Sequence, residues 1–512
     1  MIKLPFSLFG KSPVESVSIP SKRNLKVKLA GQKRSLKKLR SFNAASTGRL
    51  FADWMNYETP INEDLFGRLE TMRSRGRDMA KNNSYFRRWL WMRERNIVGE
   101  NGISLQMKIT NPNGSQDTFA NNTIEGAFKD WGNKGSCSTD GKISWLQAQN
   151  EYARLLAVDG EVFVRLVRGF DNKYRFAIKF IDAASCDTQY NATLPNGNRV
   201  INGVEIDEWG RPVAYYFFTD RNIYTSRWSG NRIRWSAEDI VHCYKEEFCG
   251  QTRGFPRGVA AMPKMHMLDK YNQAQVVAAR AGASKMGFYE IKDGHDYQPD
   301  AIEADEMVDE VAPGKIQLLP EGVSFKEYNP TFPANEHASF IKTILREAAG
   351  DWGVAYNLLA NDLEGVNYSS LRAGALDERD GWKAEQAEMI TDFIKPIFNA
   401  WLEMFLLTPL SGTLPMRKMD KFSSGQSWIP RSFPWVDPEK DAKAKVLEMQ
   451  NLIESPIKVA KEKGHDYEEL LAEIQYAKQL QEKYGLTVDN MEEKNEQVSE
   501  NEENDDKDSS SI

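Results

Sequence analysis

One stretch of the chain, from Gln251 to Glu290, constrains the fold more than any other part of the sequence. It opens with a turn segment that resets the direction of the chain; the residues that mark it are Gly254, Pro256, Gly258 and Pro263. From about Lys264 to Lys285 there is no proline, and most residues favour helix. Roughly 22 residues at a rise of about 1.5 Å predict a rod of about 33 Å.

The second half of this predicted helix is lined with small residues. They are Ala274, Ala278, Ala279, Ala281, Gly282, Ala283 and Ser284. Such side chains allow neighbouring helix backbones to approach closely, and they bury little area by themselves. Taken alone, the pattern is that of a core helix in a globular domain, so the segments on either side must decide what the helix does.

Charge is distributed unevenly along the 512 residues, although the net charge is only −6. Residues 1–41 hold eleven Lys and Arg against one acid, Glu15, and residues 487–512 hold ten acids against two lysines. Both ends lack hydrophobic periodicity, which predicts a disordered basic arm (1–41) and a disordered acidic tail (486–512). A basic arm can contact nucleic acid phosphates or simply aid solubility. The hydrophobic fraction of the whole chain, 41%, is typical of a globular protein, and its length allows two or three domains.

The elements predicted between the two ends belong to the α+β class. A helical segment runs from Asn62 to Gly99 with a break at Asn82–Asn83, and five or six short strands in 161–245 predict a small antiparallel barrel or sandwich. The other predicted elements are a strand at 103–109, helices at 121–131 and 144–158, two short strands around Pro320–Gly322, a helix at 336–350, a loop at 353–370, a long helix at 369–407, a Gly/Ser/Pro-rich link at 410–434, and a helical pair at 437–455 and 466–483.

Arginines are concentrated in the first helical segment, and two interpretations of them stay open. They are Arg73, Arg75, Arg77, Arg87 and Arg88. These side chains could bind phosphate. Alternatively, they form a solvated or subunit-facing helix side, with Asp78, Glu94 and Glu100 as their ion-pair partners.

Motifs that would indicate an enzyme are absent from the sequence. There is no GxxxxGK[ST] loop, no GxGxxG after a strand, no HExxH and no GxSxG, and the five histidines are scattered. The His242, Cys243 and Cys249 spacing fits no zinc template, and four scattered cysteines indicate reduced intracellular thiols. No apolar run is long enough to span a bilayer. We therefore expect no catalytic residue, no metal, no cofactor and no membrane contact, in a cytoplasmic-type chain.

One acidic cluster keeps an enzyme alternative open. It consists of Glu303, Asp305, Glu306 and Asp309. Carboxylates can hold divalent metal, as they do in nucleases, and the chain would then be a DNA-processing, metal-dependent enzyme. The near-continuous spacing is also that of a solvated helix side.

Several short strings occur in an order and spacing that together match a known family. They are Arg73–Asn83, Asn96–Gly102, Trp131, Asp159–Phe163, Gly203–Glu205, Gly210–Tyr215, Val241–His242, Gln251–Pro256, Leu345–Gly350, Asn367–Arg372 and Trp435–Lys440. On these residues the chain resembles the lambda-type bacteriophage portal proteins, over roughly residues 42–488. The segment Gly350–Val354 departs from the family, which usually has a shorter apolar link there.

The resemblance implies the portal fold, with long stem helices, a small β-barrel-like part of the wing, an α/β clip and a helical crown. The implied divisions are 42–263 for the wing with its β-rich part at 161–245, 264–285 for the first stem helix, 286–335 for the clip, 336–350 for the second stem helix, 351–430 for the channel loop and long wing helix, and 431–485 for the crown.

The resemblance also implies a function and partners. Family members form a ring, usually of twelve subunits, at one capsid vertex, through which double-stranded DNA passes during packaging and ejection. Terminase, the head–tail connector, and the major capsid and scaffold proteins are the implied partners, and assembly would occur in the host cytoplasm before the ring becomes part of the virion.

Three sets of residues follow from the implied ring. Asn361, Glu364, Asn367 and Tyr368 would lie on the channel loop. Ala278, Ala279, Ala281 and Ala283 would pack stem helices of neighbouring subunits together. Glu303, Asp305, Glu306 and Asp309 would form the acidic face of the clip. Besides the enzyme, a monomeric or dimeric scaffold protein with ordinary core helices remains an alternative.

Overall fold

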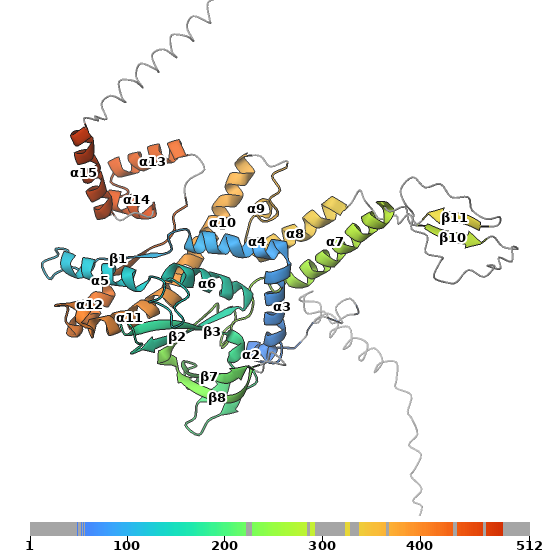
Figure 1. Ribbon diagram of the computed structural model, residues 1–512, viewed down its shortest axis with the longest axis horizontal. Helices are drawn as coiled ribbons and strands as arrows, with labels where there is room; N and C mark the ends of the chain where they lie inside the picture. Colours follow the sequence, from blue (N-terminus) through green and yellow to red (C-terminus); the bar gives the residue numbers. More distant parts are fainter. Residues whose placement is uncertain are drawn as a thin grey trace, which may run out of the picture. The chain divides into compact units, whose positions relative to one another are not determined.

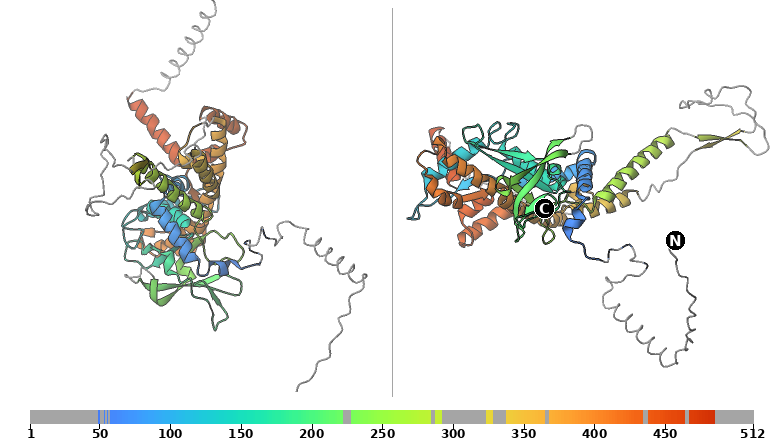
Figure 2. Two further views of the ribbon diagram at one scale, coloured as in Figure 1. Left: turned by 90° about the vertical axis from the view of Figure 1, so that its right-hand side faces the viewer. Right: turned by 90° about the horizontal axis from the view of Figure 1, so that it is seen from below.

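The computed structural model describes residues 57–221, 228–283, 287–291, 323–327, 337–364, 368–433, 438–463 and 467–484, with Arg49, Asp53 and Met55 as isolated positions. The chain divides into two units, residues 1–60 and 61–512, and the second carries the elements discussed below (Figures 1 and 2). The predicted basic arm and acidic tail lie outside the described residues.

The described elements mix helices and strands. The α-helices are α2 Ile61–Leu65, α3 Leu69–Asn82, α4 Ser84–Arg93, α5 Thr118–Trp131, α6 Trp145–Val158, α7 Met262–Ala283, α8 His337–Asp351, α9 Tyr356–Ala360, α10 Tyr368–Met389, α11 Lys395–Leu406, α12 Met419–Ser424, α13 Pro438–Gln450, α14 Pro456–Glu462 and α15 Tyr467–Tyr484. The π and 3-10 turns are η3 Glu94–Val98, η4 Ala183–Ser185, η5 Ala237–Asp239, η7 Ile390–Ile394, η8 Pro409–Ser411 and η9 Met416–Lys418. The strands are β1 Ser104–Met107, β2 Glu161–Arg168, β3 Phe176–Ile181, β4 Ala192–Thr193, β5 Arg199–Ile201, β6 Val204–Ile206, β7 Pro212–Arg221, β8 Trp228–Ser236, β9 Ile240–Tyr244, β10 Gly287–Ile291, β11 Val323–Glu327 and β12 Gln426–Ile429.

The first helical segment breaks where the sequence predicts. Asn83 has extended backbone angles, and its side-chain oxygen accepts a hydrogen bond from the backbone N–H of Phe86 at 2.8 Å, which caps α4. A further break between α2 and α3, at Gly67 with φ +70°, was not predicted. The segment ends at Gly99, in agreement with the prediction, and there φ is +80°.

The long helix predicted at 369–407 is confirmed as α10, the π turn η7 and α11, which follow one another without a break. Its apolar face meets α5 and α6 in an aromatic core. The rings of Trp145 and Phe393 stack at 5.6 Å between centroids, and those of Trp401 and Phe405 stack at 4.9 Å. Large aromatic side chains such as these contribute most of the burial energy of a core.

The β-rich part forms two antiparallel sheets. Their strand orders are β3-β2-β9 and β4-β5-β6-β7-β8. The sheets share a small core in which Phe163 of β2 lies against Tyr215 and Phe217 of β7, at 5.6 and 5.3 Å between ring centroids. The described strands do not close into one barrel, so the barrel-like arrangement is not confirmed.

Two local predictions are wrong, and a third is incomplete. The link at 410–434 contains α12 and the strand β12, which pairs with β1 from Ser104↔Ile429 to Met107↔Gln426. The loop at 353–370 contains the one-turn helix α9. The predicted C-terminal helices at 437–455 and 466–483 are confirmed as α13 and α15. The prediction missed α14 between them: Leu452 adopts a left-handed backbone with φ +58°, and the Ser455 hydroxyl, just before α14, accepts a hydrogen bond from the Lys458 N–H.

Of the two short strands predicted around Pro320–Gly322, the structure confirms one. The second predicted strand is β11, and it pairs with β10 in the register Gly287↔Glu327. The first predicted strand, within residues 314–319, lies outside the described residues.

Candidate functional site

Helices α7 and α8 lie side by side and antiparallel (Figure 1). Near one end, Lys264 of α7 forms an ion pair with Glu347 of α8. Further along, the ring of Tyr271 on α7 contacts those of His337 and Phe340 on α8, at 5.3 and 5.4 Å between centroids. The helices predicted at 264–285 and 336–350 are thus confirmed as α7 and α8, and the structure adds that they are neighbours.

The base of the pair is held by buried apolar side chains. Met262, Met265 and Leu268 of α7 are buried, and so are Leu345 and Ala348 of α8. All five belong to the main hydrophobic core. From Gln273 onward the described side chains of α7 are exposed or half-buried.

The segment that leads into α7 is fixed by a buried carboxylate, Glu161. The Arg253 guanidinium donates to both of its oxygens, with the shortest contact 2.5 Å from Nη2 to Oε1. Arg73 of α3 donates to Oε1 at 2.7 Å, and the backbone N–H of Gly254 donates to Oε2 at 3.1 Å. His242 Nε2 lies 3.0 Å from Oε2 and donates to it, because a carboxylate can only accept.

The electrostatics of this network follow from burial and pairing. Burial alone would raise the pKa of Glu161, but the charge of Arg253, the hydrogen bonds from His242 and Arg253, and the charge of Arg73 together hold that pKa well below its usual range. Burial lowers the pKa of His242, against the opposing effect of Glu161, so the ring stays neutral at neutral pH. The Glu161 network therefore joins α3, the three-stranded sheet and the segment before α7 through charged groups that keep their charge and through the neutral ring of His242.

A second carboxylate, Glu385 of α10, whose side chain is half-buried, joins the same segment to α4. Its oxygens lie 2.6 Å from Arg93 Nη2 and 2.8 Å from Arg257 Nη1. Burial would raise the pKa of Glu385, and the charges of Arg93 and Arg257 lower it overall. Arg257 also reaches Glu388 at 3.4 Å. The segment just before α7 is thus held by two ion pairs, Arg253 with Glu161 and Arg257 with Glu385.

These contacts decide part of the open question about the arginine-rich helices. Arg73 forms a buried ion pair with Glu161, and Arg77 bridges Asp159 at 2.7 Å and Asp182 at 2.5 Å. Neither uses the partners that the sequence suggested, and neither is free to bind phosphate. Acidic residues 82 to 105 positions away supply the pairing, which no local pattern could indicate.

Beyond its base, α7 exposes apolar side chains. Val276 and Val277 are exposed by 69% and 65%, and Phe340 of α8 by 49%. Of the predicted packing residues, Ala278 is half-buried and Ala279 is exposed, while Ala281 and Ala283 belong to the last turn of the same helix. An exposed apolar face on an anchored helix is typical of a surface that another chain covers.

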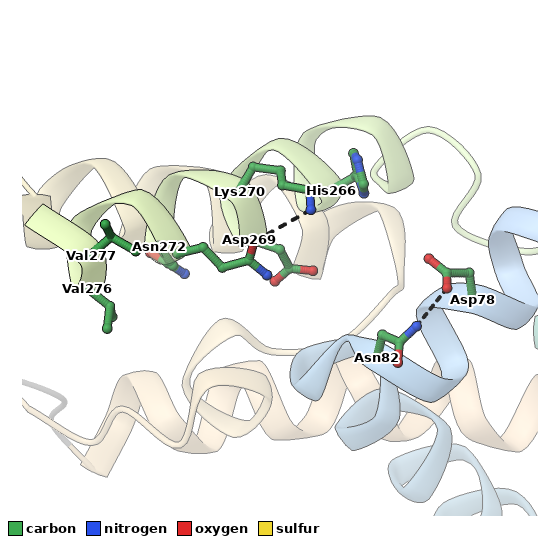
Figure 3. A pocket seen from close by; sticks show the side chains of 9 residues that line it. Asp78, Asn82, His266, Asp269, Lys270, Asn272, Val276 and Val277 are labelled. Carbon is green, nitrogen blue, oxygen red and sulfur yellow. Dashed lines mark hydrogen bonds between the residues drawn. The ribbon is translucent and has the colours of Figure 1, made fainter. Parts of the chain in front are cut away.

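A groove of about 860 Å³ lies beside this face, between α3 and α7 (Figure 3). Asp78 and Asn82 of α3 line one side, and Asn82 Nδ2 donates to Asp78 Oδ1 at 2.7 Å. His266, Asp269 and Val276 of α7 are among the residues of the other side. Asp269 also accepts a hydrogen bond from Asn83 at 2.8 Å, which joins α7 to the break between α3 and α4.

The predicted channel loop follows α8 and α9. Asn361 is exposed and left-handed, with φ +54°, and Glu364 is exposed. Asn367 lies outside the described residues, and Tyr368 is the first residue of α10. Asp362, which lies next to Asn361 in this loop, was not singled out from the sequence. Its carboxylate lies 3.0 Å from Lys342 Nζ and accepts a hydrogen bond from the Tyr356 hydroxyl at 2.8 Å. Mainly the hydrogen bond from Lys342, and to a smaller extent that from Tyr356, lowers the pKa of Asp362 to about 2.

The predicted acidic clip residues Glu303, Asp305, Glu306 and Asp309 lie outside the described residues. Within the described part of the chain, no group of three or more His, Cys, Asp or Glu is arranged to hold a metal ion. His242 and Cys243 have other contacts there: the histidine bonds Glu161, and the Cys243 thiol donates to the Asp392 carbonyl at 3.2 Å. Among the same described residues, no helix combines the length and apolar composition needed to cross a bilayer.

Comparison with known sequences decides the family. The family described as phage portal protein, lambda family, matches residues 47–386. This chain is a lambda-family phage portal protein. The probable portal protein of Halomonas phage phiHAP-1 is 33% identical over 445 residues, which is 85% of this portal protein and 85% of the relative. Portal protein B of Escherichia phage lambda is 21% identical over 469 residues, 83% of this chain and 86% of the relative.

One similar solved structure is titled "Neck of empty GTA particle computed with C6 symmetry". It is 12% identical, has a TM-score of 0.41, and the match covers 82% of this portal protein and 99% of that chain. The named relatives are portal proteins, which are structural proteins of the phage particle, and no enzyme family is among these matches.

Proposed function

We propose that this portal protein forms a ring, of twelve copies, at one vertex of the capsid, and that double-stranded DNA passes through the ring during packaging and ejection. Terminase and then the head–tail connector dock on it, and it contacts the major capsid and scaffold proteins as the particle assembles in the host cytoplasm. Family membership supports this function.

One observation carries the assembly part of the proposal: the exposed apolar face of α7 beside its firmly held base. The Glu161 and Glu385 networks fix the start of the helix, while Val276 and Val277 remain exposed. A ring needs two different faces that meet, because each subunit presses one face against the other face of its neighbour. We assign the α7–α8 pair and the groove beside it to these contacts.

The division into parts follows the same proposal. Helix α7 is the first stem helix and α8 the second, the segment between them is the clip, and α9 with the following loop borders the channel. The two sheets and α10–α11 are wing, and α13–α15 are crown. A ring of twelve would carry a charge of about −72, so the ring as a whole repels DNA, and attraction to the duplex would be limited to local basic surfaces.

The test is the mass of the purified protein by light scattering, followed by negative-stain imaging. We expect particles of about twelve times 58.4 kDa with a central hole. Val276→Asp should leave the fold intact and reduce the ring fraction at least tenfold, since a charge on a covered apolar face must be desolvated without a partner. Leu410→Asp, at an exposed apolar residue on η8, is the matched control.

A wild-type protein that enters no ring, alone or with scaffold and capsid proteins, would refute the proposal. Equal ring fractions for Val276→Asp and wild type would instead refute only the assignment of α7 to the subunit contact.

A further inference from the structure

Several arginines that do not belong to the Glu161 and Glu385 networks lie where α4, η3, α10 and the segment after β12 meet. Arg87, Trp91 and Arg95 follow one another at intervals of four residues, so they share one face of α4 and η3. Arg379 comes from α10, and Arg431 from the segment that follows β12. We call these five residues the arginine surface.

Direct contacts and mutual charge effects hold part of this surface together. Arg431 Nη1 donates to the backbone carbonyl of Arg95 and, at 2.7 Å, to Asn96 Oδ1. Burial lowers the pKa of Arg431; Glu100 opposes this shift, and the positive charges of Arg379 and Arg95 lower the pKa further. The positive charges of Arg95 and Arg379, from two other segments, therefore both act on the guanidinium group of Arg431.

The members of the arginine surface differ from the other arginines nearby in their pairing. Arg73, Arg77, Arg93 and Arg257 all form ion pairs with carboxylates. By contrast, Arg87, Arg95 and Arg379 form no ion pair with any carboxylate that the structure describes. Unpaired like charges held close together are stabilised when an external anion binds between them.

An aromatic side chain adds to the surface. Trp91 is 47% exposed, and the Arg87 guanidinium lies 5.9 Å from its ring centroid, while that of Arg431 lies 5.3 Å from the ring of Phe433. These ring contacts orient the guanidinium groups without neutralising them.

We propose that the arginine surface binds the phosphate backbone of double-stranded DNA. The proposal rests on the proposed function, in which DNA passes the chain. From Arg87 to Arg95 the helix extends over about 12 Å, and duplex DNA presents one negative charge per about 1.7 Å of its axis, so an extended polyanion can meet several groups at once. Guanidinium groups pair with phosphate oxygens in a forked geometry, and such contacts are independent of base sequence.

The test compares two double variants of the full-length chain. Arg95→Gln with Arg379→Gln removes two charges from the surface and breaks no ion pair among the described residues. Lys129→Gln with Lys134→Gln removes the same charge from two exposed lysines at the end of α5, and is the control. Fluorescence anisotropy measures binding of a labelled duplex of about 20 base pairs at several salt concentrations, and the basic arm contributes equally to all three proteins.

For the arginine variant we expect the slope of log K against log[salt] to fall by about 1.8, since each lost phosphate contact removes about 0.9. Its affinity at low salt should fall at least tenfold, with the control close to wild type. Equal losses in both variants would show a general charge effect, and no loss in the arginine variant would show that the surface is not used; either result overturns the proposal.

Light scattering on the same samples separates this result from the proposed function. If the wild type forms no ring, the ring proposal fails, while DNA binding by the arginine surface is still scored on the isolated chain. If rings form and the two variants bind DNA equally, only the arginine surface is refuted.

Discussion

The Glu161 network offers a sharp test of how α7 is held. The change Glu161→Gln removes one negative charge and keeps the shape of the side chain. In the wild type, Glu161 faces the buried guanidinium groups of Arg73 and Arg253 at 2.7 and 2.5 Å, and all three side chains are at most 2% exposed. The variant leaves two buried positive charges without their shared partner.

Removing one partner of a buried ion pair costs about 3–5 kcal/mol, because the remaining charge stays desolvated. The cost here falls on the segment that joins Glu161, Gly254 and the start of α7, since the Gly254 N–H also donates to Glu161. At about 1.4 kcal/mol per tenfold change, the local opening equilibrium should rise by roughly 100- to 4,000-fold.

Hydrogen exchange followed by mass spectrometry measures this opening in peptides that cover residues 251–265. The control is Glu403→Gln, which removes a half-exposed carboxylate that lies 3.4 Å from Arg168 and should change exchange by less than about fivefold, as exposed pairs contribute at most about 1 kcal/mol. Exchange in Glu161→Gln within fivefold of wild type would refute the view that this carboxylate holds the segment in place.

Two further predictions concern the same region. At Gly160, φ is +83° and an added Cβ would lie 1.9 Å from the carbonyl carbon of Phe255, so Gly160→Ala should lower the free energy of unfolding, measured by urea titration, by more than about 3 kcal/mol. The control is Gly126→Ala, where an added Cβ has nothing within 4 Å and which should be neutral or stabilising. Equal behaviour of the two variants would contradict the close approach of Phe255 to Gly160. Folding lowers the pKa of His242, so the neutral ring contributes stability at pH 8 that is lost as the pH falls below about 6.5. The difference in free energy of unfolding between wild type and His242→Gln should therefore shrink between pH 8 and pH 5. A constant difference would show that folding does not lower the pKa of this ring.

Local patterns predicted the elements that local interactions form. Asn82–Asn83 ended a helix because an asparagine side chain caps the next one, and the 3–4 spacing of Phe393, Ile397 and Trp401 predicted the long helix because that face is buried. The order of short strings predicted the portal family, which sequence comparison then confirmed.

What the sequence could not predict depends on residues far apart in the chain. Glu161 was predicted only to begin the strand-rich region 161–245, yet its role as a shared partner of Arg73 and Arg253 depends on contacts across 88 and 92 positions. An acid at the start of an otherwise apolar strand was the available signal, since such a residue is seldom buried without a partner. Asp362 was missed for the same reason, because Lys342 reaches it from another helix.

The pairing of β1 with β12 has a consequence for the order in which the protein can fold during synthesis. Met107 and its partner Gln426 are separated by more than 300 residues. At a translation rate of about 5–20 residues per second, the ribosome needs roughly 15–60 s to deliver the second strand after the first. For that interval β1 leaves the ribosome with an unpaired edge, so newly made chains are exposed to mispairing with one another until the C-terminal third has been synthesised.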